Sequence, residues 1–356
     1  MVYTAMIMAY CSTFMRLVGR YNPFCKVFLL ILQQVIKSFM RIGTIFSALA
    51  ILVCAPQVTA QKVEPIRYGD FEQWVTRDIK ESAVLGGKRK QVFAVGPEKT
   101  IEGAKAYVPE GGTPWASSNV YARVVGITKT SNAVYPDARE SGGRCAKLTT
   151  KLEHCKAIGL ININVLVAGT LFTGRMFEPI TGTSEPYAKM EMGVPFTKKP
   201  KTLRFDYKVE MPATNTRTYS SGFGSRKTLA GADKAEAYII LQRRWEDEDG
   251  NLYAKRVATG RDTYSKSTPG WVNAHDVKLH YGDASSVPGT MKLIPSEKSY
   301  YARNSKGKMV PVHEVGWDSA DATPTHMLIM FSAGSGEPYM GTIGLTLWVD
   351  NVALTY

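Results

Sequence analysis

The segment AYIILQRRWEDEDGNLYAKRV, residues 237–257, decides the fold class. Its two flanking runs, IILQRRW and LYAKRV, are rich in β-branched and aromatic residues, which favour strands. Between them, DEDGNL contains Asp-Gly and Gly-Asn, dipeptides typical of tight turns between antiparallel strands. The segment therefore predicts a β-hairpin.

Strand-like runs of the same kind fill the chain after residue 60. Residues 144–152, 202–211 and 345–356 alternate with a period of two, and residues 326–334 form a near-continuous apolar run. No stretch sustains a long helical period. Short pieces around 70–82 and 232–237 are the best helical candidates. We predict one all-β domain over 61–356, a jelly-roll or galactose-binding-like β-sandwich.

The surplus length of this domain is expected in long loops rich in Gly, Ser, Lys or Pro, at 85–112, 212–232 and 284–318. No linker divides the domain in two.

The first 60 residues differ from the rest because they contain no Asp or Glu. Met40-Arg41 precedes the apolar run IGTIFSALAILVCAP, and the small residues VTA end at Ala60. This pattern predicts a signal region over 1–60, with the true start at Met40 and cleavage after Ala60. The alternatives are a two-helix anchor that includes residues 27–36, and lipidation of Cys54.

Removing residues 1–60 leaves 39 basic and 31 acidic residues, a net charge of +8. The basic residues are dispersed, and GGKRK at 86–90 is their densest run. A clustered basic patch would indicate nucleic acid. This pattern indicates a soluble surface with a basic bias, and no nucleic-acid partner.

Two cysteines, Cys145 and Cys155, remain after cleavage. An even number in an oxidising compartment favours a disulfide between them. The alternative is two buried thiols.

No common catalytic motif occurs after residue 60: GxSxG, P-loop, dinucleotide-binding glycines and HExxH are all missing from the sequence. A glycosidase would need two carboxylates facing each other across a cleft. Spacing along the chain does not tell which acids converge in a sandwich, so the catalytic residues stay open.

Loop tryptophans are the candidates for binding carbohydrate, because the apolar faces of sugars stack on aromatic rings. Trp115 lies in GGTPWASSN near Asn119, and Trp317 lies in HEVGWDSAD beside Asp318. These four residues form the candidate carbohydrate-binding set, whereas the tryptophans in strand-like sequence are expected in the core: Trp74, Trp271 and Trp348.

The two ends of the domain carry matching acid-containing strands, YGDFEQW at 68–74 and TLWVDNVALTY at 346–356. If the first and last strands lie together, Glu72 and Asp350 could meet. Calcium, which prefers oxygen ligands, or a basic side chain would then balance their charge. Phe71 and Trp74 are expected to pack in the core.

These motifs resemble one protein family. GDFEQW resembles its GxFExW opening, and GTIGLTLWVDNVALTY is similar to its closing GSxGSxLYVDDVxLxY. Between them, TPWASSN, GGRCAKLTT, AGTLFTGRM and MGVPFTKKPKTLRFDYKVEM follow in the same order. The chain from about residue 68 to 356 thus resembles the putative carbohydrate metabolism domain (PCMD) family, exported proteins of Gram-negative gut bacteria.

The resemblance implies a jelly roll similar to carbohydrate-binding modules, and a possible glycoside hydrolase activity. It also implies a structural calcium held by Glu72 and Asp350, although Asn351 replaces the second closing acid and lowers the charge of that site.

Taken together, these observations predict an exported protein that recognises or processes a polysaccharide or oligosaccharide at the cell envelope. It would lie in the periplasm or at the cell surface, with possible association with the outer membrane. A glycoside hydrolase using two Asp or Glu residues is one alternative. A structural or adhesive surface protein without a sugar site is the other.

Overall fold

The computed structural model describes residues 61–157, 161–185, 187–222, 225–335 and 337–356, with isolated helical positions at 27, 31 and 34. Residues 1–60 and 61–356 form separate units, and the second contains all of the described strands. Met40, Cys54 and the predicted cleavage after Ala60 lie outside the described residues. Among the described positions, no helix combines the length and apolarity needed to cross a membrane.

The described part of 61–356 contains strands and no α-helix, which confirms the predicted all-β, sandwich-like fold. Two 3₁₀ turns, η1 (Ala83–Leu85) and η2 (Ser296–Lys298), are its only helical pieces. The short helices expected around 70–82 and 232–237 are wrong, because β2 (Trp74–Lys80) and β19 (Ala235–Glu246) begin there.

One face of the sandwich is a six-stranded sheet in the order β21-β15-β27-β9-β8, with β1 paired to β27. Its strands are β1 (Val63–Pro65), β8 (Val134–Ala138), β9 (Arg144–Thr149), β15 (Thr202–Glu210), β21 (Val272–Lys278) and β27 (Thr346–Thr355).

The other face is a ten-stranded sheet in the order β14-β25-β19-β20-β24-β23-β13-β12-β5, with β22 paired to β20. Because β12 also pairs with β25, the hydrogen-bonded path returns to one of its own strands. Its strands are β5 (Trp115–Ser117), β12 (Thr170–Met176), β13 (Met190–Met192), β14 (Val194–Pro195), β19, β20 (Leu252–Tyr264), β22 (His280–Tyr281), β23 (Tyr300–Arg303), β24 (Met309–Trp317) and β25 (His326–Ser332).

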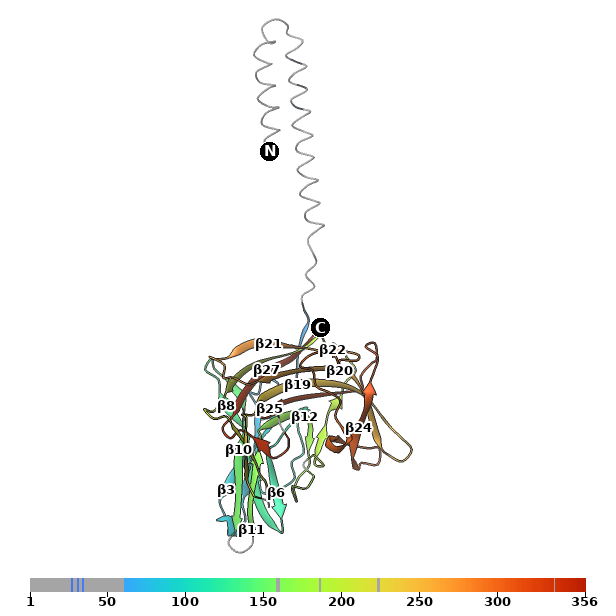
Figure 1. Cartoon of the computed structure of the whole chain (residues 1–356). Coiled ribbons are helices and arrows are strands. Elements are labelled where there is room, and N and C mark those ends of the chain that lie inside the picture. Colours follow the sequence, from blue (N-terminus) through green and yellow to red (C-terminus); the bar gives the residue numbers. More distant parts are fainter. Residues whose placement is uncertain are drawn as a thin grey trace. The chain divides into compact units, whose positions relative to one another are not determined.

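Smaller sheets occupy much of the sequence expected to form loops. The hairpins of β10, β11, β3 and β6 extend to one side of the arched large sheets (Figure 1). The strands of these smaller sheets are β2, β3 (Arg89–Val95), β4 (Lys99–Glu102), β6 (Val120–Val124), β7 (Ile127–Ser131), β10 (Lys151–Ala157), β11 (Ile161–Val167), β16 (Thr216–Tyr219), β17 (Ser221–Gly222), β18 (Lys227–Ala230) and β26 (Met340–Gly341).

The predicted hairpin at 237–257 is confirmed. Strands β19 and β20 pair in antiparallel register from Ala235↔Tyr264 to Glu246↔Leu252, with one bulge between Leu241 and Gln242. At the turn, the Asp247 carboxylate accepts the Asn251 N–H at 2.8 Å, and Gly250 takes a positive φ of 89°. The turn residues therefore fix the register of the longest strand pair.

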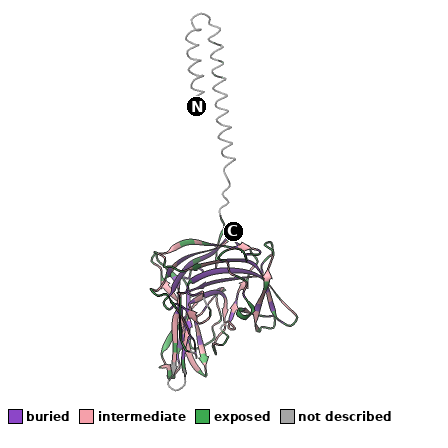
Figure 2. Cartoon of the chain, viewed as in Figure 1, coloured by how far each residue is buried: buried purple, intermediate pink, exposed green. Residues whose placement is uncertain are grey.

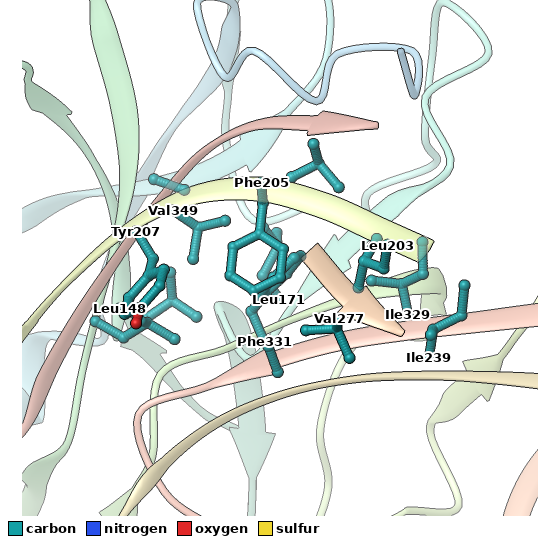
Figure 3. Close-up of a cluster of buried hydrophobic side chains, with 14 of the residues drawn as sticks. Leu148, Leu171, Leu203, Phe205, Tyr207, Ile239, Val277, Ile329, Phe331 and Val349 are labelled. Carbon is teal, nitrogen blue, oxygen red and sulfur yellow. The ribbon is translucent and has the colours of Figure 1, made fainter. Parts of the chain in front are cut away.

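The main core lies between the two large sheets, where Phe205 and Val349 of one sheet meet Ile239 and Phe331 of the other (Figure 3). Along β19, Ala237, Ile239 and Leu241 enter this core. The alternate residues Tyr238 and Ile240 enter a second cluster on the opposite face of the sheet. Both faces of β19 are thus covered, which explains its continuous apolar sequence and the buried band in Figure 2.

The last strand lies beside the start of the domain, because β1 pairs with β27 from Val63↔Thr355 to Pro65↔Ala353. The strand expected at 68–74 is wrong, because residues 67–70 form a turn and the next strand, β2, begins at Trp74 in a separate sheet. Gly69 continues this seam, since its N–H binds the Ile66 carbonyl and its carbonyl accepts the Val352 N–H, each at 2.8 Å. A Cβ at Gly69 would lie 2.8 Å from both the Ile66 and Val352 carbonyl oxygens. The close backbone approach therefore requires glycine.

Candidate functional site

A cavity of about 890 Å³ lies on the face of the ten-stranded sheet that points away from the main core. The second cluster forms its floor, with Met190, Met192 and Tyr238 among the shared residues. Strands β10 and β11 and the segments 290–295 and 337–340 supply its sides. Side chains alternate between the two faces of β19, so Glu236 and Tyr238 line the cavity while Ala235 and Ala237 lie in the main core.

Three tyrosines form a hydroxyl-bearing surface on this floor. The Tyr238 and Tyr300 hydroxyls lie 2.5 Å apart, and the Tyr238 hydroxyl also lies 3.0 Å from the Met330 sulfur. The Tyr187 ring packs edge-on against Tyr300 with 5.7 Å between centroids. Burial raises the pKa of Tyr238 well above its ordinary value and that of Tyr187 to about 12, so these hydroxyls stay protonated at neutral pH.

A partly buried ion pair, Glu236 with Arg261, lines the same cavity as the tyrosines. The Glu236 carboxylate accepts a hydrogen bond from Arg261 Nε at 2.9 Å, and Arg261 Nη2 lies 2.7 Å from the same oxygen. Burial nevertheless raises the pKa of Glu236, because desolvation outweighs the attraction of Arg261, and the charge of Asp233 adds to the rise. The raised pKa favours the protonated form of Glu236, which is the form that can donate a proton.

A second ion pair, Glu337 with Lys298, lines the same cavity nearer to solvent. The negative charges of Glu337 and Glu236 both contribute to the raised pKa of Tyr187, after its burial. The Tyr187 hydroxyl is thus influenced by both carboxylates.

The remaining floor and sides are apolar and adaptable. Methionine is the commonest residue type there, and its flexible side chain fills irregular spaces. The methionines that line the cavity are Met176, Met190, Met192, Met291, Met330 and Met340.

Two of the predicted sugar-binding residues are structural. Trp115 is 1% exposed, packs edge-on against Phe71 and donates its indole N–H to the Arg67 carbonyl at 3.1 Å. Asn119 is buried, and its side chain exchanges four hydrogen bonds with the backbone of Phe93, Ala133 and Val134. The prediction that Trp115 and Asn119 bind carbohydrate is therefore wrong, because neither has a surface free for a ligand.

Trp317 and Asp318 lie at the end of β24 and do not line the cavity. The Arg256 guanidinium lies 5.5 Å from the centre of the Trp317 ring. The Asp318 carboxylate is occupied by Arg243, at 2.6 and 3.2 Å. The structure thus separates these two residues from both the cavity and the Trp115 region.

Among the other tryptophans, Trp74 and Trp348 are buried, as expected. The prediction that Trp271 lies in the core is wrong, because its side chain is half-buried. The Arg139 guanidinium lies 4.4 Å from the centre of its ring. The most exposed described tryptophan is Trp245, at 40%, which stacks on Tyr253 beyond the core.

The acids of the predicted calcium site bind other partners. Both Glu72 oxygens accept the Arg144 backbone N–H, at 3.0 and 3.1 Å. Asp350 pairs instead with Arg139, which also contacts Asp206 at 2.8 Å. The described residues contain no group of three or more His, Cys, Asp or Glu placed to hold a metal ion. These donors do not fit calcium, because the Arg139 guanidinium already balances the buried acids.

The two cysteines are free, so the predicted disulfide is absent from this structure. Cys145 lies on β9 in the six-stranded sheet, whereas Cys155 lies on β10 in a separate three-stranded sheet. Between these strands the chain changes sheets at Thr150, whose hydroxyl binds the Ala333 carbonyl at 2.6 Å. Burial raises the pKa of Cys145 to about 12, which leaves an unreactive thiol.

Sequence reasoning did not single out Glu236, Tyr187 or Tyr300 for the site. One signal was present: Glu236 stands in AEAYIIL, an otherwise apolar strand sequence. A charged residue at such a position needs a partner or a function. The other two residues line the same cavity as Glu236 only because the fold brings together segments that lie far apart in the sequence.

Comparison with known proteins supplies the family. The family model described as "Putative carbohydrate metabolism domain" matches residues 71–355. The chain is similar to the crystal structure of a putative glycoside hydrolase from Bacteroides thetaiotaomicron VPI-5482, with 21% identity and a TM-score of 0.42, over 79% of this chain and 70% of the other. A search of the curated proteins found no match. The family match connects the protein with carbohydrate metabolism: the chain belongs to the putative carbohydrate metabolism domain family.

Proposed function

We propose that the protein binds an oligosaccharide or polysaccharide in the cavity lined by Glu236 and Tyr238 of β19. The observation that carries this proposal is the combination of tyrosines and ion pairs within one cavity of about 890 Å³. Cavities of roughly 300–1,000 Å³ that combine apolar walls with a few fixed polar groups are the usual form of ligand sites. The family match independently connects the chain with carbohydrate metabolism.

The chemistry of the lining suits a sugar. Aromatic and methionine side chains offer apolar contact to C–H groups, while Tyr187, Glu236 and Arg261 offer hydrogen bonds to hydroxyls. Glu236 is held by Arg261 before any ligand arrives, so little ordering is needed on binding. A surface protein without any sugar site would not need these buried polar groups beside an open cavity.

Binding to a glycan array, followed by calorimetry with the best ligand, tests the proposal. Tyr187→Ala and Glu236→Gln should each weaken binding by about tenfold or more, since a lost contact of about 1.4 kcal/mol is tenfold in affinity. Trp245→Ala is the control, because Trp245 is exposed and outside the cavity. Loss of binding in Trp245→Ala alone, or no binding of any glycan, would overturn the proposal.

A second candidate function is glycoside hydrolysis at the same cavity. It is favoured by the raised pKa of Glu236, because a glycosidase needs a carboxylic acid that stays protonated to assist the leaving oxygen. Glu185 and Glu337 also line the cavity and are the candidates for the second carboxylate. Release of reducing sugar by the wild type, and its loss in Glu236→Gln at glycan concentrations that saturate the variant, would establish this function.

The location that we propose is the periplasm or cell surface of a Gram-negative bacterium. The signal-like sequence of residues 40–60 supports export. N-terminal sequencing of protein from fractionated cells should find Gln61 at the mature terminus. An uncleaved chain in the cytoplasmic fraction would contradict it.

A further inference from the structure

We infer that the cavity selects glycans that carry a negatively charged group, such as a uronic acid carboxylate or a sulfate ester. This inference rests on the proposed carbohydrate binding and adds the substrate class. It is drawn from the charges that line the cavity and from which of them already have partners.

Basic side chains outnumber acidic ones in the lining. Among the lining residues that the structure describes, six are basic and four are acidic, a net charge of +2 with histidine neutral. The basic residues are Lys129, Lys189, Arg217, Arg261, Lys292 and Lys298. A cavity with low-dielectric walls and a surplus of one sign attracts ligands of the opposite sign.

Most of the acids are already neutralised by cations. Glu236 pairs with Arg261 at 2.7 Å, Glu337 pairs with Lys298, and Glu153 pairs with Lys151 at 2.7 Å. Glu185, the fourth, is exposed. The negative charge facing a ligand in the interior of the cavity is therefore largely compensated.

Arg217, in contrast, has no acidic partner among the described residues. Its Nε atom is buried and, within that part of the chain, has no hydrogen-bond acceptor. Its Nη2 atom makes one long contact, 3.4 Å, to the Ala230 carbonyl. Lys189 and Lys292 likewise form no ion pair with any residue that the structure describes.

The unpaired guanidinium determines the ligand chemistry. A buried donor without an acceptor is costly, and a charged acceptor from the ligand would remove that cost. Carboxylate and sulfate both present two or more oxygens to the planar fork of an arginine. Arg217 is thus the recognition residue for the anionic group, while the tyrosines contact the sugar rings.

The test measures affinity for three oligosaccharides of similar length: an oligogalacturonide, a sulfated galactan fragment and a neutral galactan fragment. The wild type should bind at least one anionic ligand about tenfold or more tightly than the neutral one, because a hydrogen bond to a charged group is stronger than one between neutral groups. The preference should shrink as salt is added. The better of the two anionic ligands identifies the recognised group.

Arg217→Gln should abolish this preference by weakening the affinity for the anionic ligand, and Lys189→Gln should reduce it. Arg226→Gln is the matched control, because it removes the same charge from an exposed residue outside the lining. Melting curves exclude misfolded variants. Neutral glycans binding as well as anionic ones, or a preference that survives in Arg217→Gln and Lys189→Gln, overturns the inference and leaves the proposed function standing. No binding of any glycan overturns both.

Discussion

Replacing Glu314 by Gln should severely destabilise the domain and loosen one side of the cavity. The side chains of Glu314 and Arg256 are both fully buried and form a two-point ion pair. Glu314 also accepts the Gln242 side-chain N–H and the Ile294 backbone N–H, each at 2.7 Å. Arg256 in turn donates to the Met291 carbonyl at 3.1 Å. This pair therefore tethers residues 291–294, which line the cavity.

The magnitude depends on burial. Removing one partner of a buried ion pair leaves the other charge uncompensated and costs about 3–5 kcal/mol. The matched control is Arg243→Met, which breaks the Arg243–Asp318 pair at a guanidinium that is 48% exposed. Exposed pairs contribute about 0–1 kcal/mol, so the two variants should differ clearly.

Equilibrium denaturation in urea measures both variants as changes in the free energy of unfolding. Glu314→Gln should lose about 3–5 kcal/mol, and calorimetry on the folded fraction should show weaker glycan binding. A loss equal to that of Arg243→Met would refute the reasoning, because it would mean that the buried charge of Arg256 needs no partner.

Three further predictions concern the seam and the cavity. Gly69→Ala should cost about 1–3 kcal/mol in urea denaturation, because its Cβ would meet the Val352 carbonyl oxygen, and an unchanged stability would refute the close approach. Arg139→Met should destabilise the domain by leaving Asp350 unpaired. Calcium or a chelator should leave the melting temperature of the wild type unchanged. A clear rise in the melting temperature with calcium would show that the protein does bind this metal. The pKa of Glu236 is raised in the folded state, so the fold binds its proton more tightly than the unfolded chain does. The stability of the wild type relative to Glu236→Gln should therefore fall as pH rises from its ordinary pKa of 4.5 through the raised value, and a relative rise would contradict the shift.

The strands were predictable where a single local pattern determined them. The hairpin at 237–257 combines strand-forming runs with Asp-Gly turn chemistry. In the strand within 345–356, apolar and polar residues alternate, and this strand pairs with the start of the domain. The pattern in 144–152 looked equally continuous, but the chain changes sheets at Thr150. Periodicity cannot show such a change. The disulfide inferred from the even number of cysteines was wrong, because the change of sheet separates Cys145 from Cys155.

The site was less predictable because it forms through long-range pairing. Trp115 lies in a Gly- and Pro-rich sequence typical of loops, yet it belongs to a short strand and is buried against Phe71. Glu236 and Tyr187 are separated by 49 positions in the sequence, yet both line the same cavity in the folded chain. The seam was predicted only in part, because the last strand pairs with residues 63–65 and not with 68–74. The cation of the seam, Arg139, comes from the loop between β8 and β9, and no pattern in the sequence indicated it.

A crystal structure of the protein soaked with its best-binding oligosaccharide tests the central claim most directly. We predict a sugar ring in the cavity above β19, in contact with Tyr187 and the Glu236–Arg261 pair. A sugar bound elsewhere, for example on the exposed Trp245 and Tyr253 rings, with the cavity empty, would contradict the account.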